Sequence, residues 1–376
     1  MMWRLVAILI MFSSMIYGDE YDFDMDAIEK KPYEYSGYLR VEDKIQQLNK
    51  ENDESQNYLH IEGLLNLSYE YETLKFESSV IASYDYIKDK IAYEEFVVND
   101  LYLENRFNVN HTVLIGKESL RWGKGYFFNP VAYFDRPKDP SEPTQAREGF
   151  NIVKYSYNKA FNSVLKNLSF DAVYLPSTDK INKDYYRFAT KQRDANNLAF
   201  RLYMLLYDTD IDIIYNYSDE ASQKIGFDFS KNIQTNFEIH GEYSNIIDSG
   251  YRYLLGIRYL SEFELTIISE YLYYSDGLNK EEIQESDMMI PFSAKDYWVT
   301  LLTQKEPFEW LYSSIYYKNM MNLEDKSQQN RIGITYSFKN NIFTDLSYNL
   351  NSGDNLSEFA KKQVKSFLWL RITWNF

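Results

Sequence analysis

The sequence predicts an all-β protein, a single transmembrane antiparallel up-and-down β-barrel of about 18 strands, with 16 as the lower bound. Three observations support this fold class. Apolar and polar residues alternate with a period of two in many segments, the chain ends on such a segment, and its first residues have the composition of a secretory leader.

The 376 residues include no cysteine, which excludes a disulfide scaffold and a thiolate metal site. The formal net charge of -16 argues against a nucleic-acid partner.

Residues 1–18 are predicted to be a signal peptide. Arg4 precedes an apolar run over residues 5–12, small residues follow, and cleavage is expected after Gly18. Residues 19–32 are expected to be a short acidic segment. No later stretch is apolar enough for a membrane helix, which needs roughly 18 apolar residues. The mature chain is therefore expected either to be soluble outside the cytoplasm or to enter a membrane as a closed β-barrel.

Residues 33–376 are predicted to form the barrel. The alternation is clearest in residues 59–69, 74–86, 251–259 and 332–338, where apolar residues share one face of a strand and polar residues share the other. A charged face has to be wet or internally paired, so the apolar face is expected outside and the charged face inside. About 18 segments have the roughly 9 to 11 residues that a tilted strand needs to span a membrane.

The connections between these segments are alternately short and long, which is typical of bacterial barrels with short periplasmic turns and long outer loops. An even number of strands returns the C-terminus to the periplasmic side. Tyrosines near the expected strand ends, such as Tyr215 and Tyr273, predict aromatic girdles at the membrane interfaces. The short turns are expected near Glu72, Asn108, Asp208, residues 231–232, residues 261–262, Pro307 and residues 340–341.

The last ten residues alternate strictly, and one face carries Leu370, Ile372, Trp374 and Phe376. This segment resembles the C-terminal strand of Gram-negative outer-membrane β-barrels. The resemblance implies insertion in the outer membrane, contact with its lipid, and recognition of these four residues by the barrel-assembly machinery. A soluble protein seldom ends on an exposed apolar strand, because such a strand promotes aggregation in water.

Residues 119–148 are unlike the other connections, because they are long, contain half of the chain's prolines and include closely spaced glycines. They are predicted to be either a constriction loop folded into the lumen or an ordered loop on the outer surface. Their position resembles that of the long third loop of porins. The strings RWGKGYFFNP (121–130) and REGF (147–150) are similar to a segment of porin-like and polysaccharide-export-type barrels. The candidates for the constriction are Arg121, Lys124, Arg136, Lys138 and Arg147.

The expected inner wall carries more carboxylates than cations, and rings of carboxylates select cations. A wall of this charge disfavours an anionic polysaccharide as the substrate. At least half of these charges are expected to pair across strands. The pore-lining candidates are Glu62, Glu77, Asp100, Glu104, Arg201, Asp212, Glu238, His240, Glu242, Arg252, Arg258, Glu264, Glu270, Arg331 and Arg371.

The sequence does not predict an enzyme, a cofactor or a metal site, since its histidines, His60, His111 and His240, lie in no recognisable nucleophile motif. The favoured function is that of a porin, a passive outer-membrane channel for ions and small hydrophilic solutes with a preference for cations. The alternatives are a non-conducting barrel that acts as a surface interaction or adhesion module, and a polysaccharide-export-type barrel. Trimers are common among the porins that the chain resembles, so a homotrimer is an expectation of that resemblance.

Overall fold

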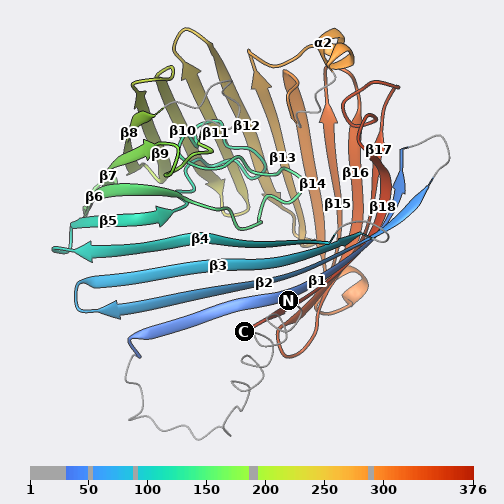
Figure 1. The fold of residues 1–376 in the computed structure, drawn as a ribbon, viewed down its shortest axis with the longest axis horizontal. Coiled ribbons are helices and arrows are strands. Elements are labelled where there is room, and N and C mark those ends of the chain that lie inside the picture. Colours follow the sequence, from blue (N-terminus) through green and yellow to red (C-terminus); the bar gives the residue numbers. More distant parts are fainter. Residues whose placement is uncertain (1–30, 50–53, 88–91, 186–193, 287–291) are drawn as a thin grey trace, which may run out of the picture. The chain divides into compact units, whose positions relative to one another are not determined.

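A computed structural model describes five stretches of the chain: residues 31–49, 54–87, 92–185, 194–286 and 292–376. Of these residues, Tyr33–Phe376 belong to one compact unit, the barrel (Figure 1). The signal peptide with its cleavage after Gly18, and nearly all of the acidic segment expected at 19–32, lie outside the described residues. No helix in the described part of the chain is long and apolar enough to cross a membrane.

The described residues form 18 β-strands, which confirms the predicted fold class. Two short helices, α2 (Lys280–Glu285) and η2 (Pro307–Glu309), lie in the connections. The strands are β1 (Tyr33–Leu48), β2 (Ser55–Tyr71), β3 (Leu74–Ile87), β4 (Tyr93–Arg106), β5 (His111–Glu118), β6 (Phe150–Ala160), β7 (Leu165–Ser177), β8 (Ala195–Leu206), β9 (Thr209–Ser218), β10 (Lys224–Gln234), β11 (Phe237–Ile246), β12 (Gly250–Leu260), β13 (Leu265–Tyr274), β14 (Asp296–Lys305), β15 (Ser313–Asn322), β16 (Gln328–Ser337), β17 (Ile342–Ser352) and β18 (Val364–Asn375).

Each strand pairs antiparallel with its neighbours in the sequence, and the first and last strands close the barrel. The pairing of β1 with β18 runs from Tyr38 opposite Asn375 to Leu48 opposite Val364. Next to it, the backbones of Gly37 and Phe376 exchange two hydrogen bonds of 3.1 Å. Closure satisfies the backbone groups of both strands along this seam, which a membrane-spanning sheet requires.

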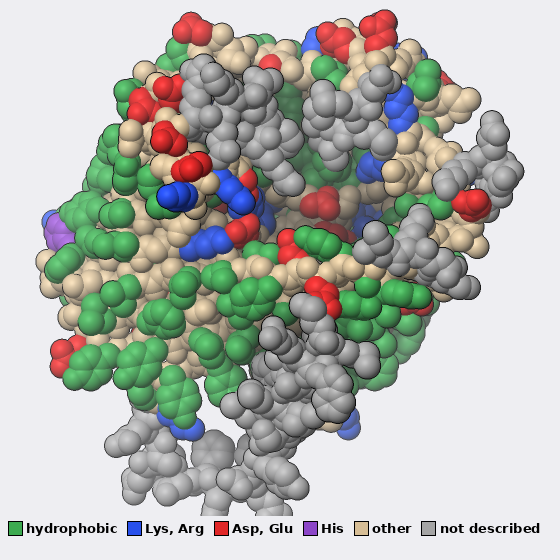
Figure 2. Space-filling view, viewed as in Figure 1, with side chains coloured by type: hydrophobic (Ala, Val, Ile, Leu, Met, Phe, Trp, Pro, Cys, Tyr) green, Lys and Arg blue, Asp and Glu red, His purple; other side chains and the backbone are tan. Residues whose placement is uncertain are grey.

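Side chains alternate between the two faces of the wall, as the period of two predicts. In β2, Ile61 and Leu67 are exposed on the outer face, whereas Glu62 is buried on the inner face. Figure 2 shows apolar side chains, in green, over the outer surface of the wall, and charged side chains, in red and blue, inside a central hollow. The wall therefore has an apolar outer surface and a charged interior, the reverse of a soluble barrel.

Short turns lie at the end of the barrel where Phe376 lies, and the longer connections lie at the other end. Six of the seven turns expected from the sequence fall within or next to observed turns. The turn expected at residues 231–232 is wrong: β10 continues to Gln234 through a register shift, and the chain turns at residues 235–236. Glu264, which was expected on the inner wall, lies in the turn between β12 and β13.

The connection between β5 and β6, residues 119–149, folds into the barrel and is called the inner loop below. Its apolar side chains pack into two clusters against the inner wall. Trp122 and Phe134 join buried residues of β5 to β9, whereas Phe127 and Phe128 join buried residues of β12 to β15 and of the longer connections. Burial of these side chains stabilises the inward position of the loop by roughly 1.5–3 kcal/mol each. The apolar core therefore lies inside the barrel.

Candidate functional site

Two buried carboxylates on the wall hold the inner loop by its backbone. Glu242 on β11 accepts hydrogen bonds from the N–H groups of Lys124 and Gly125, both at 2.7 Å, and of Val131 at 3.2 Å. The side-chain amide of Asn129 donates to the same carboxylate at 3.0 Å. Hydrogen bonds to an ionised carboxylate are among the strong ones, and these satisfy backbone groups that are buried away from water.

The next residues of the loop are held by Glu270 on β13. The N–H groups of Tyr126 and Phe127 donate to its carboxylate, the latter at 3.0 Å. His240 lies beside it on β11, with Nε2 at 3.0 Å from Glu270 and Nδ1 at 3.6 Å from Glu238. The Tyr126 ring packs edge-on against His240, with 5.2 Å between the ring centroids. His240 therefore orients the Glu270 carboxylate toward the loop.

The motif that begins at Arg121 needs glycine at two positions. Gly123 has a φ of +96°, and a Cβ added there would lie 2.6 Å from the side chain of Asn129. A Cβ added to Gly125 would lie 2.0 Å from the carbonyl oxygen of Phe128. Only glycine lets the backbone turn this tightly and approach the wall carboxylates. The string RWGKGYFFNP is therefore an anchor between the inner loop and the wall.

The far end of the inner loop is fastened to the opposite wall. Glu142 forms ion pairs with Arg331 on β16 and with Arg371 on β18, the second at 2.9 Å. Lys318 on β15 donates to the carbonyl groups of residues 140 and 141. Burial would raise the pKa of Glu142, but the charges of Arg331 and Arg371 outweigh it and lower the pKa to about 2. The inner loop therefore crosses the lumen and is tied by an ionised carboxylate at its far end.

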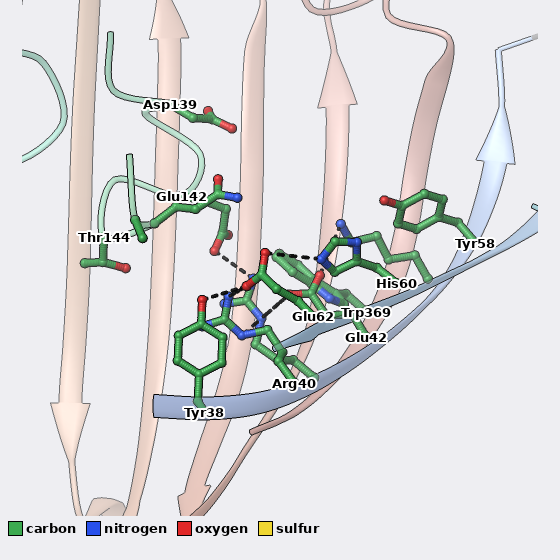
Figure 3. A pocket seen from close by; sticks show the side chains of 14 residues that line it. Tyr38, Arg40, Glu42, Tyr58, His60, Glu62, Asp139, Glu142, Thr144 and Trp369 are labelled. Atoms are coloured by element: carbon green, nitrogen blue, oxygen red, sulfur yellow. Dashed lines mark hydrogen bonds and ion pairs between the residues drawn. The ribbon is translucent and has the colours of Figure 1, made fainter. Parts of the chain in front are cut away.

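A pocket remains between the inner loop and the seam of the barrel, and it is called the passage below. It has a volume of about 270 Å³, with β1, β2 and β18 on one side and residues 139–146 of the loop on the other. Figure 3 shows the side chains of both sides pointing toward each other. The lining residues are Tyr38, Arg40, Glu42, Lys44, Tyr58, His60, Glu62, Asp139, Glu142, Thr144, Gln145, Ala146, Trp369 and Arg371.

Opposite charges are paired along the wall of this passage. Arg40 lies 3.2 Å from Glu62, and Arg371 lies 2.8 Å from Glu42. Lys44 lies 3.5 Å from Glu42. Arg40, Glu42 and Lys44 occupy every second position of β1, so their side chains share one face of the strand. All three line the pocket inside the barrel. A solute in the passage would therefore meet positive and negative groups at close range.

Three cations gather around one buried indole at the edge of the passage. The guanidinium of Arg371 lies 4.1 Å from the ring centre of Trp369, and that of Arg331 lies 4.7 Å from it. The ammonium of Lys44 lies 4.2 Å from the same ring centre. Attraction to the face of the ring offsets part of the repulsion among these like charges.

The cations predicted for the constriction do not line this passage. Arg121 has an exposed side chain. The other four are bound to the loop or to the wall beside it: Lys124 to Asp212 (3.1 Å), Arg136 to Glu148 (2.6 Å), Lys138 to the carbonyl of Gly125 (2.5 Å), and Arg147 to the carbonyl of Arg136 (2.9 Å). In this structure these four side chains hold the loop in place.

Two of the pore-lining candidates, Glu62 and Arg371, line the passage. A second group binds the inner loop: Asp100, Asp212, Glu238, His240, Glu242, Glu270 and Arg331. A third group is paired with other residues: Glu77 with Lys75 (2.5 Å), Glu104 with Arg106 (3.7 Å), Arg201 with Asp212 (2.7 Å) and Arg252 with Asp276 (2.7 Å). Arg258 is exposed on β12. The inner loop therefore binds the seven side chains of the second group, out of the fifteen that were expected to face open lumen.

Most residues of the passage were not among the candidates. Arg40, Glu42 and Lys44 alternate along β1 and could have been found from the period of two. Asp139 and Glu142 carried no such signal, because their position depends on where the loop is fastened. In the part of the chain that the structure describes, no group of three or more His, Asp or Glu side chains could hold a metal ion.

The fold is similar to that of solved outer-membrane barrels. OpdQ of Pseudomonas aeruginosa, a porin, matches 92% of this chain and 99% of its own at 11% identity, with a TM-score of 0.59. OccAB1 of Acinetobacter baumannii, also a porin, matches 92% of this chain and 98% of its own at 8% identity, with a TM-score of 0.58. No protein-family model and no curated protein matches the sequence.

Wzi of Escherichia coli is also similar, with 11% identity and a TM-score of 0.57 over 92% of this chain and 84% of its own. It is described as an outer-membrane protein involved in group 1 capsule assembly and as a carbohydrate-binding β-barrel. The three matches show that this chain, with its closed sheet of 18 strands, shares the β-barrel fold of these proteins.

Proposed function

We propose that this protein is an outer-membrane channel of the porin type, through which ions and small hydrophilic solutes diffuse. The observation that carries the proposal is the path of the inner loop, which is tied to the wall at Glu242 and Glu142 and leaves a charged passage beside the seam. A barrel of 18 strands is wide enough for an aqueous channel unless something fills it. The inner loop narrows the lumen, and the passage is then the constriction.

We further propose a modest preference for cations. The lining carries four carboxylates against three lysine and arginine side chains: Glu42, Glu62, Asp139 and Glu142 against Arg40, Lys44 and Arg371. A small excess of carboxylates favours cations only weakly. The carboxylates of Glu242 and Glu270 add little to this preference, because the backbone of the loop covers them.

A second candidate function is a non-conducting barrel that binds a ligand at its outer surface. Two observations favour it: the similarity to Wzi, and the two apolar clusters that occupy part of the lumen. On this alternative the pocket at the seam ends inside the barrel, and the longer connections form the binding surface. Catalysis has no place in either candidate function.

Single-channel recording separates the two functions. The mature protein is refolded, inserted in a planar bilayer, and recorded under a KCl gradient at 0.1 M and 1 M salt. A steady conductance with a cation-favouring reversal potential that fades at 1 M supports the channel, because the Debye length falls from about 10 Å to about 3 Å over this range. Absence of conductance in protein shown to be folded by its heat-modifiable gel mobility contradicts the channel and favours the binding function.

A further inference from the structure

We infer that Glu142 is a specificity-determining residue of the passage: its carboxylate occupies an oxyanion-binding site formed by Arg331 and Arg371 over the ring of Trp369, and so keeps anions out of the channel. This inference rests on the proposed channel function and deepens it. The site lies where the inner loop meets β16 and β18, and Figure 3 shows Glu142 above Trp369.

The geometry around Glu142 is that of an anion site. Its two carboxylate oxygens are shared between two guanidinium groups, Arg331 on one oxygen and Arg371 on the other at 2.9 Å. Arginine presents a planar fork of donors that matches carboxylate and phosphate oxygens. Both guanidiniums also lie within 4.7 Å of the centre of the Trp369 ring, which fixes their positions. We therefore expect the two guanidiniums to stay over the ring when the carboxylate is changed.

The site has more donors than Glu142 can satisfy. Two buried nitrogen donors at the site have no hydrogen-bond acceptor among the described residues, namely Arg331 Nε and Trp369 Nε1. Buried donors are nearly always paired in folded proteins. An oxygen-bearing group fits a site of this kind, whereas a cation does not.

The charge balance of the passage depends on this one carboxylate. With Glu142 ionised, the lining carries four carboxylates against three lysine and arginine side chains, and Arg331 beside it is paired with Glu142. Without that charge, the lining would carry three carboxylates and three lysine and arginine side chains, and Arg331 beside it would lose its ion pair with Glu142 and add an uncompensated positive charge. The passage would then attract anions and hold them at the two guanidiniums.

The test compares Glu142→Gln with Glu148→Gln. Both changes replace one carboxylate of the inner loop by an amide of the same shape, and both carboxylates pair with two cations, but Glu148 pairs with Lys117 and Arg136 away from the passage. In planar bilayers under a KCl gradient, E142Q is expected to lower the permeability ratio of K⁺ to Cl⁻ by about 25-fold, because the loss of one unit charge about 4 Å away in water changes the partitioning of each ion about fivefold, in opposite directions. E148Q should keep the wild-type ratio.

Two further measurements make each outcome decisive. Arg331→Gln in the E142Q background should restore most of the wild-type ratio, because it removes the unpaired guanidinium. Inorganic phosphate, at matched ionic strength, should raise the thermal unfolding midpoint of E142Q and not that of the wild type or E148Q, since only a folded protein with an open site binds it. This second readout needs no conductance, so it tests the site even if the channel function fails.

The inference is overturned if folded E142Q keeps the wild-type ratio and gains no stability from phosphate. It is also overturned if E148Q shifts the ratio as much as E142Q, since the effect would then be one of net charge. A several-fold rise in conductance without a change in ratio would show that Glu142 only fastens the loop.

Discussion

The carboxylate of Glu242 and the backbone N–H of Gly125 lie 2.7 Å apart, although 117 residues separate them in the chain. Three more donors, from Lys124, Asn129 and Val131, reach the same carboxylate. This contact joins a wall strand to the first third of a connection that begins six strands earlier. It places the inner loop inside the barrel, and the position of the passage follows from it.

Replacement of Glu242 by alanine is expected to release this part of the inner loop. A hydrogen bond to a charged group contributes about 1.5–3 kcal/mol, so the loss of this acceptor should weaken loop docking by at least about 3 kcal/mol. Trypsin should then cut after Lys124 and Lys138 faster than in the wild type, and single-channel conductance should rise. Glu264→Ala removes the same charge in a turn without touching the loop and serves as the control. Equal cleavage rates in E242A and the wild type would show that Glu242 is not the anchor.

Replacement of Gly125 by alanine should disturb the loop through its backbone. The added Cβ would lie 2.0 Å from the carbonyl of Phe128, so the backbone has to move, at a cost of about 1–3 kcal/mol. We expect a lower fraction of heat-modifiable, folded protein on gels and a noisier conductance. The matched change is Gly63→Ala on the outer face of β2, where the nearest atom, at 3.2 Å, belongs to the flexible side chain of Leu39. If both variants fold equally well, the close approach at Gly125 is not required.

The fold could be read from the sequence because its signals are local. A period of two, such as the one from Ile332 to Phe338, reports which face of a strand meets lipid, whatever the rest of the chain does. The spacing of these segments then gives the number of strands. Exact strand ends could not be read in the same way, because β10 continues to Gln234 through a register shift that depends on its pairing with β11.

The site could be predicted only in part, because it depends on contacts between distant residues. Lys124 was recognised as a special position, but its partner, Asp212, is known only once the loop is placed. The open side of the lumen is decided by where the apolar residues of the loop pack, such as Trp122 against β5 to β9. For that reason the sequence left the inward and outward positions of this segment as alternatives, and it did not point to Asp139 or Glu142.

Acid should release the far end of the inner loop. The pKa of Glu142 is lowered from 4.5 to about 2 in the docked loop, so its ion pairs with Arg331 and Arg371 contribute fully above about pH 4.5 and are lost as the pH falls to about 2. The shift corresponds to roughly 3 kcal/mol of docking free energy. Conductance of the wild type should change as the pH falls below about 4.5, and this change should be smaller in E142Q, which lacks the Glu142 carboxylate. An identical acid response in both proteins would assign the response to other groups.

The last residue is expected to matter more for assembly in cells than for stability. The ring of Phe376 lies against Gly37, where an added Cβ would be 2.8 Å from the ring, and the backbone bonds between these residues do not involve the ring. Phe376→Ala therefore keeps the pairing of β1 with β18 and should destabilise the refolded barrel by about 1 kcal/mol, from the partial loss of apolar contact. In cells, by contrast, the amount of folded barrel in the outer membrane should fall several-fold, because the terminal aromatic residue is the proposed assembly signal.

The control for this prediction is Asn375→Ala, which changes the neighbouring side chain and should alter neither the stability of the refolded barrel nor the amount in the outer membrane. If F376A and N375A reach the membrane in equal amounts, the terminal ring is not that signal; if refolding in detergent falls as much as assembly in cells, the ring acts through packing at the seam.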